Sequence, residues 1–247
     1  MDRNQFLATQ AAEILAAAGQ EKLIARLLGG MAVYDTYECT RRQPFQREIH
    51  DLDFIVTKRS AAGFSKLLPV LGYSGDHQFN SIHGETRMLF ISEQTEIDVF
   101  IGIFHQCHEL NFEHVLSLTK TTIPITHLLL TKLQIFQINR KDQLDALALL
   151  HDHEPQAGAG GDGIDLSVLT SITGNDWGWH TTVSDNLESL TGLVDELFTG
   201  EEKGLFHRRI GAIQDAMQGA PKSVKWKLRE KIGRRVPWYD LPEEKQL

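Results

Sequence analysis

Three aspartates are the residues of this chain best suited to chemistry. Asp51 and Asp53 lie two positions apart in a run that reads as a strand, and Asp98 lies in a similar run at residues 95–103. Side chains alternate between the faces of a strand, so Asp51 and Asp53 share a face. If the two strands lie nearby with matching orientation, the three carboxylates converge, and cations must offset their repulsion. The sequence therefore predicts a site for divalent metal.

The elements that must position these carboxylates form a small mixed sheet in the sequence pattern. Residues 85–91 and 95–103 alternate on either side of the tight turn at residues 92–94, which predicts an antiparallel hairpin with Asp98 in its later strand. Helical spacing predicts an N-terminal helix over about residues 4–28 and another over about residues 61–71. We expect these helices to cover one face of the sheet.

A glycine pair, Gly29-Gly30, interrupts the apolar pattern before a short segment that begins at Met31. Between two helical segments, such a pair lets backbone N–H groups approach an anion without obstruction by a Cβ atom. A helix that starts there also directs its positive end at the anion. The pair therefore predicts a seat for phosphate.

Three features appear in order along the chain: a Gly-Gly pair ahead of a helix, an Asp-x-Asp strand, and a third Asp on a later strand. This pattern resembles the nucleotidyltransferase superfamily, whose fold is shared with DNA polymerase beta. Among its members, the chain is most similar to the bacterial AbiEii-type nucleotidyltransferase-like group. The resemblance covers roughly residues 20–150 and includes the Arg that precedes the Asp-x-Asp motif, the Lys in an apolar helix and the Lys-Asp-x-x-Asp helix after it. These residues are Arg47, Lys132, Asp142 and Asp145.

The resemblance implies an α+β fold and a metal-dependent enzyme that moves a nucleoside monophosphate from an NTP such as ATP onto an acceptor hydroxyl. Two Mg²⁺ ions suit this reaction because they stabilise the attacking and leaving oxygens together. Asp51 and Asp53 are expected to bridge both ions, whereas Asp98 binds one ion and accepts the proton of the acceptor. Gly29, Gly30 and Arg47 are expected to bind substrate. The acceptor, a small molecule, an RNA or a protein, is not specified by the sequence, and neither is the oligomeric state.

Lys132 lies in an apolar helical segment and allows two interpretations. It could contact phosphate in the cleft, or it could extend from the surface with its amine in water. Asp142 and Asp145, three positions apart on one helical face, could orient Lys132 or the acceptor. Alternatively, their negative charges near the start of the helix stabilise it through its dipole.

The glycine-rich stretch at residues 154–163 predicts a linker, because it cannot sustain a helix or strand. We therefore expect a catalytic domain at residues 1–153 and a helical domain at residues 164–247. Near the end of the chain, residues 222–235 hold seven Lys or Arg and one Glu, so this segment carries +6 and the remainder carries −14. It could bind a polyanion, with Trp226 as a stacking face, or form a solvated amphipathic helix.

Composition points to an ordinary soluble protein. The chain has 247 residues, 41% of them hydrophobic, and can bury a substantial core. It contains no apolar run of membrane-spanning length and does not begin with a signal-peptide pattern, so we expect it in the cytoplasm. Cys39 and Cys107 are expected to be free thiols. The histidines near residues 105–108 and 151–153 lack the paired spacing of a structural zinc site.

Two other functions remain open. A non-catalytic binding module on the same fold, such as half of a toxin–antitoxin pair, is favoured by Met31, which stands where many nucleotidyltransferases carry Ser, and by the long spacing from Gly30 to Asp51. A nucleic-acid-binding accessory protein would act through residues 222–235, but the acidic remainder of the chain disfavours it.

Overall fold

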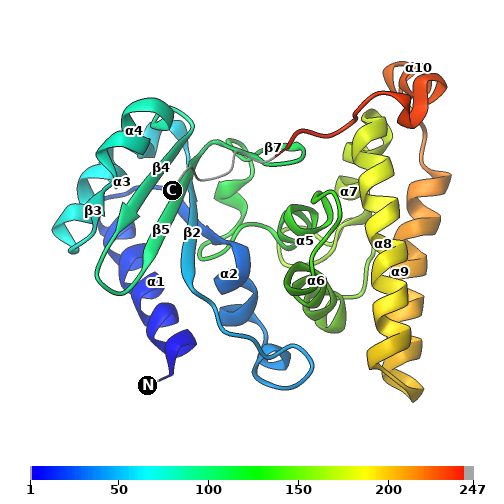
Figure 1. Cartoon of the computed structure of the whole chain (residues 1–247), viewed down its shortest axis with the longest axis horizontal. Helices are drawn as coiled ribbons and strands as arrows, with labels where there is room; N and C mark the ends of the chain where they lie inside the picture. The colour runs from blue at the N-terminus through cyan, green and yellow to red at the C-terminus, as the bar shows by residue number, and fades with distance from the viewer. Residues whose placement is uncertain (1, 242–247) are drawn as a thin grey trace. The chain divides into compact units, whose positions relative to one another are not determined.

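The computed structural model describes residues 2–241 and divides the chain into two compact units (Figure 1). The first unit comprises Met1–Phe104 and Leu110–Pro124, and the second comprises His105–Glu109 and Ile125–Leu247. The expected α+β class is confirmed, since a mixed sheet precedes a run of helices. The division differs from the expected domain boundary, because the two helices that precede residue 153 cluster with the second unit.

The first unit is built around a five-stranded sheet. Its elements are α1 (Arg3–Gln20), β1 (Ala25–Leu28), α2 (Gly29–Thr36), η1 (Glu38–Arg41), β2 (Asp51–Val56), α3 (Lys58–Val70), β3 (Ser74–Gly75), α4 (His77–His83), β4 (Arg87–Ile91), β5 (Glu96–Ile101) and η2 (Leu116–Leu118). The strand order is β1-β2-β5-β4-β3, and Figure 1 shows β5 between β2 and β4. A separate two-stranded sheet joins β6 (Ile103–His105) to β7 (Glu109–Asn111).

The sheet is mixed because β2 and β5 run parallel while the other neighbours are antiparallel. The expected hairpin is confirmed as β4 and β5, with Leu89 opposite Asp98. Phe54 follows Asp53 along β2 and so points to the opposite face. Its ring meets that of Phe64 on α3, with a centroid distance of 5.8 Å. The apolar core under α3 therefore lies on the face opposite the carboxylates.

The expected N-terminal helix over residues 4–28 is wrong at its C-terminal end. The helix ends at Gln20, and Ala25–Leu28 form β1, which pairs antiparallel with β2. The residues of β1 are good helix formers, but pairing at the edge of the sheet overrides their local preference. The glycine pair therefore lies between a strand and a helix and not between two helices.

The second unit is helical. Its elements are α5 (Ile125–Leu133), α6 (Arg140–Asp152), α7 (Leu166–Asn175), α8 (Trp177–Leu197), α9 (Gly200–Gly219), α10 (Val224–Ile232) and η3 (Gly233–Arg235). Side chains of Asn139, Asp165, Asp176 and Ser223 accept backbone N–H bonds at the N-termini of α6, α7, α8 and α10. Within residues 2–241, no helix is both long and apolar enough to cross a bilayer.

Residues 154–163 form a tethered loop within the second unit. Asp165 accepts hydrogen bonds from the backbone N–H groups of Gly158, at 3.0 Å, and Gly160, at 3.3 Å. Thr126 on α5 donates to the carbonyl of Gly163 at 3.0 Å. The stretch is irregular, as its glycine content predicts, and these bonds tie it to other residues of the second unit.

Two buried histidines in the second unit make stability depend on pH. Burial lowers the pKa of His108 and that of His127 to about 4 in each case. In the unfolded chain these groups titrate near pH 6.5, so the unfolded state binds more protons between about pH 6.5 and pH 4. The stability that the neutral imidazoles contribute is therefore complete above pH 6.5 and is lost as the pH falls through this window.

We expect the free energy of unfolding to fall more steeply between pH 6.5 and pH 4.5 in the wild type than in a His108→Asn/His127→Asn variant. The contribution is on the order of 3 kcal/mol for each histidine at full effect. Urea denaturation followed by circular dichroism at several pH values measures both slopes. Identical slopes in the two proteins would show that neither histidine is held neutral by the fold. Cys39 and Cys107 are buried, and neither forms a disulfide.

Candidate active site

The three aspartates predicted from the sequence converge on one face of the sheet. Because β2 and β5 are parallel, Asp53 lies directly beside Asp98, and Asp51 lies beside Glu96. Asp51 shares the face of Asp53, two residues away along β2. The condition of matching strand orientation is therefore met, and the carboxylates come together at the N-terminal part of these two strands.

Asp98 is the most buried of the three, with 3% of its surface exposed. Burial raises its pKa above the ordinary range, and the negative charge of Asp51 raises it further. Arg87 on β4 opposes both effects by donating from Nε to Asp98 Oδ1 at 2.8 Å. The Arg87 guanidinium is itself fixed over the rings of Phe79 and Phe100, at 5.6 and 5.1 Å from their centroids. Asp98 is thus held in one orientation by a neighbouring strand.

The glycine pair begins helix α2 directly against these carboxylates. Gly29 has φ of +72°, a left-handed conformation that favours glycine. A Cβ atom at Gly29 would overlap the carboxylate oxygen Oδ2 of Asp53, and a Cβ atom at Gly30 would overlap Nη2 of Arg47. The first turn of α2 therefore approaches both an aspartate and an arginine, and only glycine leaves the space that this approach needs.

Residues that precede β2 are tied to the first turn of α1. Asn4 donates to the carbonyl of Arg47 at 2.8 Å and accepts from the N–H of Ile49 at 2.9 Å. Arg3 donates to the carbonyl of His50 at 3.1 Å. These bonds fix the backbone that carries Arg47 and leads into Asp51.

A polar cavity of about 700 Å³ adjoins this tether. Its wall includes three arginines, Arg3, Arg41 and Arg47, together with Tyr34 and Glu48. Arg47 connects the cavity with the glycine pair, since its guanidinium lies against Gly30. The first unit therefore offers room for a polar ligand next to Arg47, although none of the three aspartates lines this cavity.

Lys132, Asp142 and Asp145 meet in the second unit. Lys132 Nζ lies 2.9 Å from Asp142 Oδ1 and 2.9 Å from Asp145 Oδ2. Burial by itself lowers the pKa of Lys132, but the two carboxylates outweigh it and raise the pKa. The interpretation that the aspartates orient Lys132 agrees with this geometry. A buried amine held by two carboxylates is not a surface lysine in water, and it is poorly placed to contact phosphate.

Trp226 does not offer the stacking face that the polyanion-binding interpretation of residues 222–235 requires. It is 7% exposed, and its ring meets that of His180 edge-on, at 5.2 Å and 84°. Its indole therefore belongs to the packing between α8 and α10. The charged residues of α10 lie around this buried anchor, which agrees with the alternative of an amphipathic helix.

The donor set of the carboxylate face fits Mg²⁺. Asp51, Asp53 and Asp98 offer hard carboxylate oxygens, which Mg²⁺ prefers, and few protein ligands leave positions for water and substrate. Burial is the main cause of the raised pKa of Asp98, and the charge of Asp51 adds to it, so a cation bound here would favour the ionised carboxylate. Asp51 is exposed and Asp53 is partly exposed, so solvent reaches the site.

Arg87, Arg3 and Asn4 are site residues that sequence reasoning missed. Arg87 was detectable in part, because it is the charged residue at the start of the otherwise apolar run at residues 87–91. Its partner Asp98 lies on the adjacent strand of the predicted hairpin. Arg3 and Asn4 contact residues more than 40 positions away, and no local pattern marks such contacts.

Comparison with known proteins gives little for this chain. No family model and no curated protein matches it. Among solved structures, it is similar to an antigenic nucleotidyltransferase-like protein from Paracoccidioides brasiliensis. The two share 12% identity with a TM-score of 0.43, over 88% of this chain and 94% of the other. A similarity of this size carries no argument about function, which must come from the geometry of the carboxylate face.

Proposed function

We propose that the first unit is a metal-dependent nucleotidyltransferase that moves a nucleoside monophosphate from an NTP onto an acceptor hydroxyl. The observation that carries this proposal is the parallel register of Asp53 with Asp98, with Asp51 on the same face and the first turn of α2 against Asp53. Three carboxylates and a glycine-started helix provide ligands for cations and a seat for phosphate in one place.

Each residue has a separate task in this proposal. Asp51 and Asp53 would hold two Mg²⁺ ions, which supply charge stabilisation for the attacking and leaving oxygens. Gly29 and Gly30 present backbone N–H groups to the triphosphate, and Arg47 adds a cation beside them. Asp98 would hold one ion and accept the proton of the acceptor hydroxyl, in the orientation that Arg87 imposes.

Met31 supports one alternative, a binding module on the same fold. Its side chain is 1% exposed and lies in the core, so α2 offers no hydroxyl at this position. A module of this kind, for example in a toxin–antitoxin pair of the AbiEii type, would use the same face to bind without transfer. The experiment below separates the two, because a binding module does not require an NTP together with Mg²⁺.

We expect Mg²⁺ together with one of the four NTPs to raise the melting temperature. A ligand that binds only the folded state stabilises it by mass action, by about 2.7 kcal/mol at a hundred times the dissociation constant. Differential scanning fluorimetry at millimolar Mg²⁺, with each NTP in turn, measures the shift. NTP with EDTA and Mg²⁺ without NTP are the controls, and both should give smaller shifts.

An Asp53→Asn variant provides the matched protein control, since it should lose most of the shift while its own melting temperature stays at or above that of the wild type. No shift with any NTP would favour the binding module. A shift that survives in Asp53→Asn would place the NTP away from the carboxylate face.

A further inference from the structure

The C-terminal helix α10 leaves an apolar stripe in solvent. Val224, Leu228 and Ile232 are spaced four residues apart and are 75%, 59% and 47% exposed. Val236 and Leu241, in the segment that follows α10, are also exposed, at 52% and 80%. Among residues 2–241, these five make up half of the large hydrophobic side chains that are exposed. Such a concentration on one short segment is typical of an interaction site, whereas scattered apolar residues are not.

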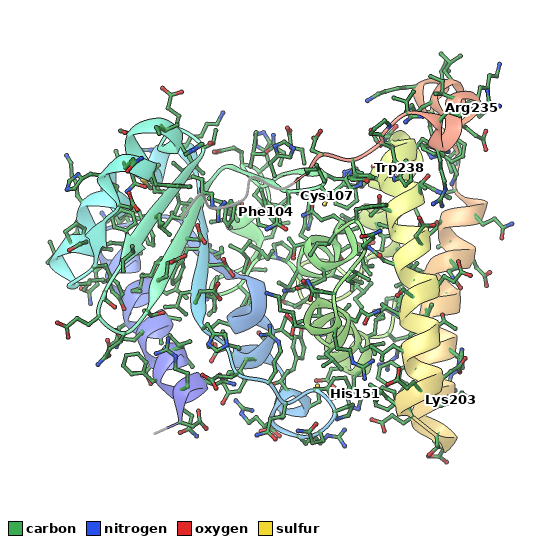
Figure 2. The ribbon with its side chains drawn as sticks, in the orientation of Figure 1. Phe104, Cys107, His151, Lys203, Arg235 and Trp238 are labelled. Carbon is green, nitrogen blue, oxygen red and sulfur yellow. The ribbon has the colours of Figure 1, made fainter. Side chains whose placement is uncertain are left out.

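The stripe borders a cavity of about 610 Å³, which we call the α10 groove. One wall includes Leu228, Arg229 and Ile232 of α10, and the remainder is formed by the start of α8, residues 107–109 and residues 237–240. Figure 2 shows Arg235 just beyond α10 and Trp238 on the segment that follows it. The groove lies entirely within the second unit.

The groove is held open by hydrogen bonds of the segment that follows α10. Arg229 donates to the carbonyl of Val236 at 2.7 Å, and Trp238 Nε1 donates to Thr182 Oγ1 at 3.1 Å. The N–H of Asp240 donates to the carbonyl of Cys107 at 3.0 Å. A groove fixed in this way binds a partner with little additional ordering of its own chain.

Positive charge beside the stripe defines the kind of partner. Lys227, Lys231 and Arg235 have no ion-pair partner in the part of the chain that the structure describes. Two of the three acidic residues that line the groove are already engaged, since Asp176 lies 3.6 Å from Lys225 and Asp240 lies 2.9 Å from His105, and Glu109 is the third. The unpaired cations and the exposed stripe together match a segment with apolar and acidic side chains.

The aromatic rings of the groove argue against a nucleic-acid strand as the occupant. Single-stranded nucleic acid needs open ring faces for base stacking. Arg229 already covers Trp177 at 4.8 Å, and Tyr239 is stacked on Phe136 at 3.8 Å and 13°. The side chains that remain most exposed are aliphatic, and they do not stack on bases.

We propose that the α10 groove docks an acidic amphipathic segment of a partner protein. Apolar side chains of that segment, three or four positions apart, would pack on Val224, Leu228 and Ile232, and its carboxylates would face Lys227 and Lys231. This inference is independent of the nucleotidyl-transfer reaction, because the groove lies in the second unit and shares no residue with the carboxylate face.

A phage-displayed library of random peptides, selected on the full-length protein, tests this inference. We expect the recovered peptides to carry net negative charge and apolar residues at a spacing of three or four. One of them, made synthetically with a fluorescent label, should bind a Leu228→Gln/Ile232→Gln variant at least tenfold more weakly. Lys227→Glu/Lys231→Glu should weaken binding as well and flatten its dependence on salt.

Matched controls on the first unit keep the test specific. Val70 and Ile82 are exposed apolar residues, at 81% and 68%, and Val70→Gln/Ile82→Gln should leave peptide affinity unchanged. Lys66→Glu, on an exposed lysine of α3, should also have no effect. Recovery of no peptide, of peptides without an acidic bias, or of peptides that bind the groove variants equally well would overturn the inference.

Three further results would assign the groove to another occupant and would also overturn the inference. The first is a dimer in sedimentation velocity that dissociates in Leu228→Gln/Ile232→Gln, which would identify a second copy of this chain. The second is binding of a dT oligonucleotide, and the third is binding of vesicles that contain phosphatidylserine. In either case Leu228→Gln/Ile232→Gln would abolish the binding, and the acidic peptides would not compete with it.

Discussion

Asp53→Asn should reduce nucleotidyl transfer by roughly 10³-fold, because the variant loses a carboxylate that would bridge both metal ions. A loss of about 4 kcal/mol of transition-state stabilisation corresponds to this factor. The fold should remain intact, since Asp53 lies on the carboxylate face, where its charge is repelled by that of Asp51 and Asp98. Initial rates of NTP consumption and the melting temperature, measured on the same preparation, report the two effects separately.

Glu93→Gln is the matched control for this variant. Glu93 is an exposed acid in the turn between β4 and β5, so its replacement removes one negative charge from the same unit without touching the carboxylate face. Its rate should stay at the wild-type value. Wild-type turnover in Asp53→Asn would remove Asp53 from the proposed catalytic role.

Lys132→Met should lower the free energy of unfolding by about 3–5 kcal/mol, because it leaves two carboxylates buried without their cation. The side chains of Lys132, Asp142 and Asp145 are each only slightly exposed, at 7% for the lysine and for Asp142. At neutral pH the orphaned aspartates must either stay charged in the core or take up a proton, and both cost stability. Denaturation in urea, monitored by circular dichroism, measures the loss.

Two further variants separate the charge effect from simple loss of packing. Lys132→Met/Asp142→Asn/Asp145→Asn removes the whole ionic cluster and should recover much of the lost stability. Lys203 on α9 forms an exposed ion pair with Asp195 on α8. Lys203→Met removes this lysine and should lower the free energy of unfolding much less. Figure 2 labels Lys203 on α9. A Lys132→Met protein as stable as wild type would mean that the aspartates do not depend on the amine.

The carboxylate face could be predicted from the sequence to an unusual extent. Alternation in β2 placed Asp51 and Asp53 on one face, and the turn at residues 92–94 defined the hairpin that carries Asp98. What the sequence left open was the relative direction of β2 and β5. That direction depends on how the chain crosses between them, and the structure shows it to be parallel.

Other features could not be predicted because they depend on contacts between distant residues. Four residues of good helix propensity, Ala25–Leu28, became a strand because β2 supplies their hydrogen-bond partners. The spacing of Asp142 and Asp145 predicted that they share a helical face, but it did not show whether that face is turned to the core or to solvent. The sequence therefore did not decide whether Lys132 is buried between them. Helical spacing around Trp226 likewise did not show which face would meet α8.

The most direct test of the proposed function is incubation of the protein with Mg²⁺, cell extract and NTPs labelled either at the α- or at the γ-phosphate. Nucleotidyl transfer keeps the α-phosphate and releases the others as pyrophosphate. The proposal predicts an acceptor labelled by α-labelled NTP and not by γ-labelled NTP, with the signal lost in Asp53→Asn and in EDTA. An acceptor labelled only from the γ-phosphate, or no labelled product with any of the four NTPs, would contradict it.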